Sequence, residues 1–461
     1  MKYISTRGKT APATFGDAVM MGLAPDGGLL LPDDIPFIAN RIDELRKLPY
    51  QRLAYEIIRL YADIPDSELR KMVKLSYSTF THKEVTPVVN VGDVWFLELF
   101  HGPTLAFKDV ALQFLGNLFE YKLSRTGREL NILAATSGDT GSAAICGVRG
   151  RKHIRIFVMH PHGRVSSIQE RQMTSVLDAN VFNIAVDGTF DDCQGILKDV
   201  FNDLSFKDRY ALGAVNSINW ARVLAQIVYY FYAAFRVMDK TGRMRVRFAV
   251  PTGNFGDIFA GYIAARMGLP VSKLVLATNE NDILSRFFNT GVYSAGKVHA
   301  TISPSMDIQV ASNFERYLFY KLGSDPVKLA AAMDDFKRSG RFAISPGASG
   351  AVDPLFAADS ATTDSTLSTI RRYYVKHKYL MDPHTAVGAG VARMWLDDSE
   401  PMICLATAHP AKFPQAIIDA IGKDAAHHPE MQKLEKMPTR MEVLPASVEA
   451  VRSYIERQIN K

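Results

Sequence analysis

The chain has few cysteines, and no pattern organises them. Its 461 residues include three, Cys146, Cys193 and Cys404. No two of them have the spacing of a metal site, and two lie in apolar surroundings, so neither a disulfide-stabilised secreted domain nor a metal site is indicated. We expect reduced thiols in a cytoplasmic protein and predict no bound metal.

Long apolar runs and dense clusters of one charge are also lacking. The longest apolar run, residues 227–235, is too short to cross a bilayer and is typical of a buried helix face. The N-terminus has no charged region followed by an apolar stretch, so we expect no signal peptide. The net charge is +6, but no lysine and arginine cluster with interleaved aromatic residues is present. We therefore predict neither a membrane nor a nucleic acid partner.

What the chain does have is ample length and an alternating pattern. Hydrophobic residues make up 47% and charged residues 22%, which is ordinary for a globular protein. Residues 1–90 are mostly helical by pattern, whereas residues 91–215 and 216–461 alternate strand-like and helical segments. Such alternation predicts an α/β fold with parallel sheets covered by helices. We expect an N-terminal extension over 1–90, a smaller α/β domain over 91–215 and a larger one over 216–461.

The first chemically informative residue is Lys108. A strand-like run over residues 94–100 ends in a Gly-Pro turn, and Leu105, Ala106 and Phe107 precede the lysine. Desolvation among apolar neighbours lowers the pKa of a lysine amine and frees it to attack a carbonyl group. A solvated lysine after a turn has the same local sequence, so Lys108 alone does not decide between the two interpretations.

Two loops between a predicted strand and a predicted helix are rich in glycine. The first follows residues 131–135 and reads Thr136-Ser-Gly-Asp-Thr-Gly141; the second follows residues 246–250 and reads Pro251-Thr-Gly-Asn-Phe-Gly-Asp257. Backbone N–H groups at a helix N-terminus bind anions, which suits a carboxylate at the first loop and a phosphate at the second. Each loop is also compatible with a capped turn that binds nothing, and Asp257 could cap its own helix.

A third strand-like run, residues 402–406, ends in Thr407-Ala-His-Pro410. Open α/β sheets place ligand contacts at the carboxyl ends of their strands, so the Thr407 hydroxyl is a candidate contact. Thr407 alone is weak evidence for a site. It gains weight because the two glycine-rich loops also follow the ends of predicted strands.

Together, these ordered motifs resemble the threonine synthase family, pyridoxal 5′-phosphate (PLP) enzymes of fold type II. The resemblance runs nearly end to end and matches the longer bacterial and fungal branch rather than the plant branch. Beyond the segments above, its motifs are Tyr3–Gly8, Pro25–Leu29, Ala214–Arg222, Ser303–Ile308 and Ala406–Pro410.

The resemblance implies a carbon–oxygen lyase that converts O-phospho-L-homoserine and water into L-threonine and phosphate, the last step of threonine biosynthesis. It implies two parallel-sheet α/β domains and a lysine, Lys108, that binds PLP covalently and moves protons. The cofactor phosphate is expected at Gly253, Asn254, Phe255, Gly256 and Asp257, the ring nitrogen at Thr407, and the ring 3-oxygen at Asp139, where many relatives carry Asn. The substrate carboxylate is expected at Thr136, Ser137, Gly138, Asp139 and Thr140, and the leaving phosphate at Asn216 and Arg222.

Two alternatives stay open. Related PLP lyases accept phosphohomoserine but release 2-oxobutyrate, or act on serine and threonine, and a product assay separates them. A catalytically degenerate relative that only binds ligands is the second, and absence of the cofactor's absorption band would favour it. The sequence leaves monomer and homodimer undecided.

Overall fold

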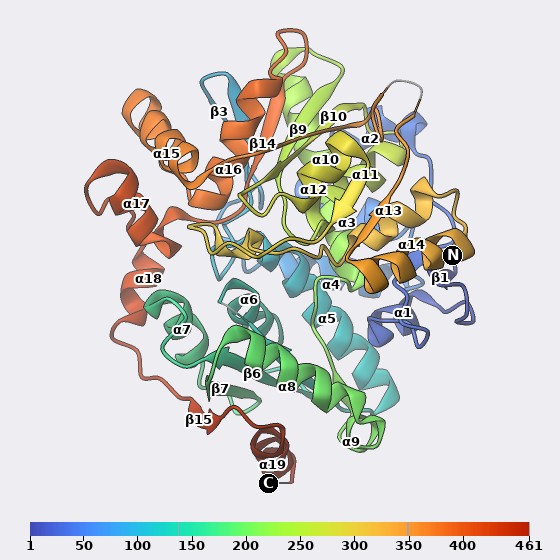
Figure 1. Cartoon of the computed structure of the whole chain (residues 1–461), viewed down its shortest axis with the longest axis vertical. Coiled ribbons are helices and arrows are strands. Elements are labelled where there is room, and N and C mark those ends of the chain that lie inside the picture. The colour runs from blue at the N-terminus through green and yellow to red at the C-terminus, as the bar shows by residue number, and fades with distance from the viewer. Residues whose placement is uncertain (137, 348–349, 461) are drawn as a thin grey trace.

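Two mostly parallel sheets form the body of the molecule, as the alternating pattern predicted (Figure 1). The structure is a computed structural model that describes residues 1–136, 138–347 and 350–460. The larger sheet has the strand order β13 (Phe356–Ser360), β10 (Val271–Thr278), β9 (Val246–Pro251), β14 (Met402–Ala406), β4 (Val94–Glu98) and β3 (Val88–Val91). Its pairs are parallel except for β3 with β4. The smaller sheet is parallel throughout, in the order β15 (Glu442–Pro445), β7 (Val181–Asp187), β6 (Ile154–Pro161), β5 (Leu130–Ala135) and β8 (Leu212–Gly213).

The two sheets take strands from both sides of the expected domain bounds. β4 pairs with β14 in the larger sheet, although it precedes the whole of the smaller one in sequence. β15, near the C-terminus, pairs with β7 of the smaller sheet. From α17 (Pro414–Ile421) the chain passes through α18 (Pro429–Leu434) to β15, and then forms the last helix, α19 (Val448–Ile459). Figure 1 shows this segment in red. The division near residues 90 and 215 therefore stays a prediction.

The N-terminal extension is mainly helical and also contains a small two-stranded antiparallel sheet. Its helices include α1 (Phe15–Met21), α3 (Tyr50–Ile58) and α4 (Asp66–Tyr77), and strands β1 (Tyr3–Ser5) and β2 (Leu30–Pro32) pair antiparallel. The extension packs on the long helix α10 (Trp220–Thr241): the ring of Tyr50 meets Tyr232 edge-on, and the Asn219 amide donates to the Val19 carbonyl oxygen at 2.8 Å. The extension therefore packs on the helix whose first turn contains a predicted site residue, Arg222.

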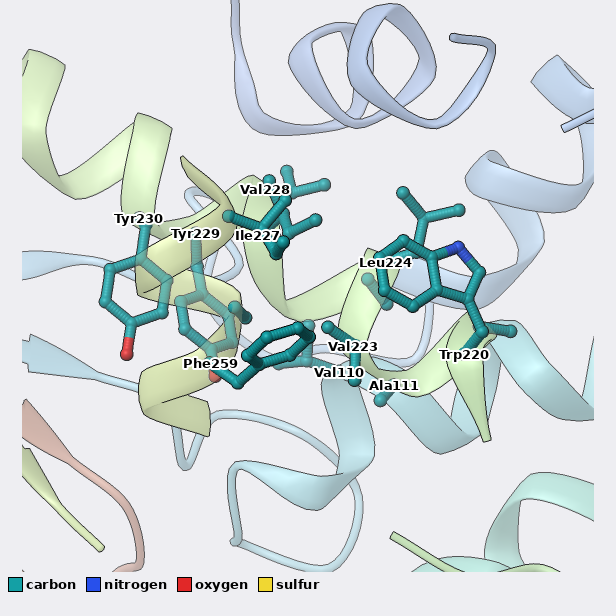
Figure 2. Close-up of a cluster of buried hydrophobic side chains, with 14 of the residues drawn as sticks. Val110, Ala111, Trp220, Val223, Leu224, Ile227, Val228, Tyr229, Tyr230 and Phe259 are labelled. Carbon is teal, nitrogen blue, oxygen red and sulfur yellow. The ribbon is translucent and has the colours of Figure 1, made fainter. Parts of the chain in front are cut away.

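Helix α10 is the centre of the core. Every residue from Trp220 to Phe235 is buried, which confirms the predicted buried helix. Figure 2 shows Leu224 and Ile227 of this helix among its buried neighbours, with Val110 of α5 (Lys108–Thr126) and Phe259 of α11 (Gly256–Arg266) beside them. Because apolar burial on this scale fixes the helix firmly, the polar groups at its first turn are held in place.

Two predictions from composition can be compared with the structure. Cys146, Cys193 and Cys404 are all free thiols, and the latter two are buried. Among the described residues, no helix is both long and apolar enough to cross a membrane.

Candidate active site

The carboxyl ends of neighbouring strands of the larger sheet bring the predicted segments together. β4, β14 and β9 are adjacent and parallel, so they end at one edge of the sheet. The Phe107 N–H donates to the Thr407 carbonyl oxygen at 2.8 Å, and Ala106 bridges Ala408. The segment that leads to Lys108 thus lies along the segment that contains Thr407, which is the arrangement expected of an α/β ligand site.

Lys108 is buried beside an acid. Only 8% of the residue is exposed, and its ammonium donates to Asp139 Oδ2 at 3.4 Å. Burial lowers the pKa of Lys108; Asp139 opposes this shift, whereas the positive charges of Lys412 and Arg222 add to it. The desolvated lysine that the sequence suggested is therefore present, and its environment favours the neutral amine more than water does.

Asp139 begins α6 (Asp139–Val148) and is held by three groups. Its Oδ1 lies 3.0 Å from the Lys412 ammonium and accepts a hydrogen bond from Gln169 Nε2 at 2.9 Å, while Oδ2 faces Lys108. Burial raises the pKa of Asp139, but Lys412 and Lys108 outweigh it and hold that pKa well below its usual range. Asp139 is therefore a buried carboxylate that stays ionised.

A second buried acid fixes the turn ahead of Lys108. Asp109 accepts hydrogen bonds from Thr104, at 2.8 Å from the backbone N–H and 2.7 Å from the hydroxyl. Burial raises the pKa of Asp109 to about 6, and the bonds from Thr104 limit the rise. Gly102 lies so close that an added Cβ would come 2.5 Å from the Asp109 Cβ. These contacts explain why a glycine and a hydroxyl precede the lysine.

The loop from Gly253 to Asp257 has the form of an anion site. Among the described residues, none of its backbone N–H groups donates a hydrogen bond to another protein group. Phe255 has a φ of 63°, a strained conformation for a bulky residue, which turns successive N–H groups at the start of α11. A Cβ added to Gly253 would come 2.8 Å from the Ser305 carbonyl oxygen, so the loop depends on glycine there. The Asn254 amide oxygen accepts from the Ser312 hydroxyl at 2.9 Å.

The Asp257 side chain is tied to helix α10. Its Oδ1 accepts from the Tyr229 hydroxyl at 2.5 Å and the Tyr230 hydroxyl at 3.0 Å. Burial raises the pKa of Asp257 to about 7, so this acid is partly protonated near neutral pH. Partial protonation reduces the negative charge that this side chain would place beside an anion, and the backbone N–H of Asp257 has no acceptor among the described residues.

The Thr136 hydroxyl organises the other predicted loop. Its oxygen accepts from the backbone N–H groups of Gly138, at 3.0 Å, and Gly141, at 2.9 Å. Gly138 has a φ of 143°, and a Cβ there would press on Gln169 at 2.6 Å, so only glycine fits. Thr140 follows in the first turn of α6. Ser137, a predicted contact of the same loop, lies outside the described residues.

Arg222 is buried and has no counterion among the described residues. The residue is 6% exposed, and its Nη1 has no hydrogen-bond partner among the described residues. Burial lowers the pKa of its guanidinium to about 10, so it remains charged at neutral pH. The side-chain oxygen of half-buried Asn216 also lacks a partner there. Because an unpaired buried charge is costly, an anionic ligand is the natural partner of Arg222.

The structure brings Lys108, Asp139, Arg222 and Thr407 into one region, as the sequence suggested, but it adds residues that the sequence reasoning missed. The additions are Lys412, Gln169, Thr104, Asp109 and His384. Lys412 had one signal, a lysine inside a short apolar segment just after Thr407. Gln169 had none, because its contact with Asp139 joins separate helices.

PLP carries an aldehyde and a phosphate, and the described residues suit both. Lys108 is a desolvated amine for the aldehyde, and the N–H groups of 253–257 form a free anion site. Arg222 supplies a further cationic group, because its Nη1 has no hydrogen-bond partner among the described residues. The described residues therefore offer separate groups for a phosphorylated cofactor and for a second anion.

The comparisons agree with this chemistry. The family model "Pyridoxal-phosphate dependent enzyme" matches residues 80–352, and the chain is a PLP-dependent enzyme of fold type II. The models "Threonine synthase N terminus" and "Threonine synthase, C-terminal" match residues 2–77 and 385–455. The chain belongs to the threonine synthase family.

Individual relatives span the same length as this chain. It is 45% identical to threonine synthase of Pseudomonas aeruginosa, covering 100% of this chain and 99% of the relative. The crystal structure of PLP-bound threonine synthase from Brucella melitensis superposes with a TM-score of 0.96 at 46% identity, covering 99% of each chain. The yeast threonine synthase structure gives 0.95 at 44% identity, covering 100% of this chain and 99% of that one. The predicted family and fold are confirmed.

Proposed function

We propose that the protein converts O-phospho-L-homoserine and water into L-threonine and phosphate. The observation that supports this substrate most directly is Arg222, a buried guanidinium near Lys108 that has no counterion in the part of the chain that the structure describes. A planar guanidinium binds a phosphate dianion in bidentate fashion. Amino-acid substrates without a phosphate would leave this charge unpaired.

In the proposed mechanism Lys108 binds the cofactor aldehyde and later moves protons at the substrate Cα. When bound, PLP supplies an electron sink for the charge that develops on the substrate carbons. The buried position of Lys108 favours its neutral amine, and ionised Asp139 at 3.4 Å offers a fixed negative charge beside it. In the overall reaction the phosphate leaves Cγ and a water oxygen is added at Cβ.

The anionic ends of cofactor and substrate have separate binding groups. The backbone N–H groups of 253–257 would hold the cofactor phosphate, and their lack of acceptors among the described residues supports this. The free Nη1 of Arg222 donates to the substrate phosphate, and Asn216 binds it through its side-chain amide N–H groups. The loop Thr136–Thr140 binds the substrate carboxylate, with the Thr136 hydroxyl oxygen fixing the backbone of that loop.

Thr407 is the residue that would hold the cofactor ring nitrogen. Its carbonyl oxygen is occupied by the Phe107 N–H, and its own N–H donates to the Thr385 hydroxyl at 3.1 Å, so its backbone is fixed on both sides. A neutral hydroxyl at this position can donate to an unprotonated nitrogen, whereas a carboxylate would keep that nitrogen protonated.

The test is to incubate the purified protein with PLP and O-phospho-L-homoserine and to identify the organic product. We expect threonine and phosphate in equal amounts. Release of 2-oxobutyrate without threonine, or turnover of serine with none of phosphohomoserine, would replace the proposal with one of the related lyase activities.

We also propose a cytoplasmic enzyme with no nucleic acid partner. The three free thiols, two of them buried, support a reducing compartment. Fractionation of cells that express the protein tests this location, and recovery with the membrane pellet would contradict it.

A further inference from the structure

Lys412 is a fully buried cation that the proposed chemistry does not use. It ends the short 3₁₀ helix η4 (Pro410–Lys412), five residues after Thr407, and is 1% exposed. Its ammonium donates to the Thr104 carbonyl oxygen at 2.7 Å and lies 3.0 Å from Asp139 Oδ1. Lysines are almost never buried this completely unless a specific partner requires them.

The position of Lys412 creates an asymmetric arrangement around Asp139. One carboxylate oxygen faces Lys412 and Gln169, and the other faces Lys108 at a longer distance of 3.4 Å. If Lys108 were the only cation, Asp139 would hold it protonated, since an opposite charge at this distance favours the charged form. A protonated amine cannot attack the cofactor aldehyde.

We propose that Lys412 is a positioning residue that supplies the countercharge of Asp139, so that Lys108 can be a neutral amine beside an ionised carboxylate. This inference rests on the proposed role of Lys108. Lys412 also connects three parts of the site, because its bonds join the turn ahead of Lys108, the start of α6 and the segment after Thr407.

The remaining charged groups around the pair are compatible with this role. Arg222 is a second cation that lowers the pKa of Lys108, and His384 is a further group that lowers the pKa of Asp139. Asp109 is the other buried acid that Lys412 influences, but both of its oxygens already accept bonds from Thr104. Asp139 is therefore the acid that needs the ammonium of Lys412.

Competitive acetylation of the cofactor-free full-length protein measures this directly. Acetic anhydride reacts with neutral amines only. Mass spectrometry of the peptides gives the extent of acetylation of each lysine at each pH, and hence the pH midpoint at which half of that amine is neutral. In Lys412→Met the midpoint of Lys108 should rise by about one pH unit or more, a tenfold loss of neutral amine at a given pH. In Asp139→Asn it should fall. Exposed Lys433, which pairs with Glu430 on the surface, serves as internal control and should not shift.

The double variant Lys412→Met/Asp139→Asn is the decisive comparison. Without the carboxylate no countercharge is needed, so the Lys108 midpoint should return towards that of the wild type, and Lys412→Arg should also lie near it. If Lys412→Met does not fold, the double variant should still fold and bind PLP. A Lys108 midpoint unchanged in Lys412→Met, or a double variant as impaired as the single one, would overturn the inference.

Two different results distinguish a wrong role for Lys412 from a wrong role for Lys108 in the proposed function. A Lys108→Ala protein that kept the visible absorption of bound cofactor would overturn the proposed role of Lys108. Loss of that absorption in Lys108→Ala, together with wild-type behaviour of Lys412→Met, would overturn the role of Lys412 alone.

Discussion

Replacing Arg222 with methionine should stabilise the cofactor-free protein while it impairs the enzyme. Burial lowers the pKa of this guanidinium from 12.5 to about 10. At about 1.4 kcal/mol per pKa unit, keeping the charge in the folded protein costs roughly 3 kcal/mol. Because Arg222 stays charged below pH 10, this cost is present in full at pH 7 and is relieved only as the pH rises through 10. Methionine fills similar space without a charge.

The loss of activity follows from the same burial. Removing one partner of a desolvated charge pair costs about 2–5 kcal/mol. At about 1.4 kcal/mol per factor of ten, kcat/KM for phosphohomoserine should fall roughly 30-fold or more. Arg222→Lys keeps the charge but loses the bidentate fork, so it should lie between the wild type and Arg222→Met.

Thermal unfolding of the cofactor-free proteins and steady-state kinetics of the holoenzymes measure the two effects. Arg128→Ala, at an exposed position, is the matched control and should change neither. PLP binding should survive in Arg222→Met, because residues 253–257 bind the cofactor phosphate. A less stable apo-protein with unchanged kcat/KM would refute the reasoning, and so would loss of PLP with unaltered substrate affinity.

Three further predictions concern the cofactor site. Gly253→Ala should weaken PLP binding at least tenfold by titration, because its Cβ would come 2.8 Å from the Ser305 carbonyl oxygen, whereas Gly195→Ala, with nothing within 4 Å, should bind PLP normally. Burial raises the pKa of Asp257 to about 7, so ionisation destabilises the fold as the pH rises from about 4 to 7. The melting temperature of cofactor-free Asp257→Asn, relative to wild type, should therefore be higher at pH 8 than at pH 5, and an equal difference at both would contradict this. Thr407→Asp should retain PLP but shift the products from threonine towards side products; a protonated ring nitrogen in the wild type by nitrogen-15 NMR would contradict the premise.

The parts of the fold that sequence reasoning predicted are those with a local signature. The strand at residues 246–250 and the glycine loop after it were recognisable because apolar runs and glycines at a helix start are local patterns. The start of the following helix at Gly256 was not recognisable in this way, because the residue before it, Phe255, adopts a left-handed conformation that no propensity favours for that residue. The threonine at the end of β14 was predicted in the same local way.

What the sequence could not supply is non-local pairing. β4 and β15 each join a sheet through a partner strand more than a hundred residues away in sequence. The period-two pattern of a strand does not specify its partner. Lys412 and Gln169 meet Asp139 from positions 273 and 30 residues away. In a sequence, a buried charge can be recognised only as a charged residue among apolar ones. This local pattern does not indicate which residue the charge pairs with.

The identity of the lysine that binds the cofactor tests the central claim most directly, because the site holds two buried lysines on either side of Asp139. The holoenzyme would be reduced with borohydride, digested and mapped by mass spectrometry. The account predicts that the reduced cofactor is attached to Lys108 and that Lys108→Ala loses both the visible absorption and turnover. Attachment to Lys412, with Lys108 unmodified, would contradict it.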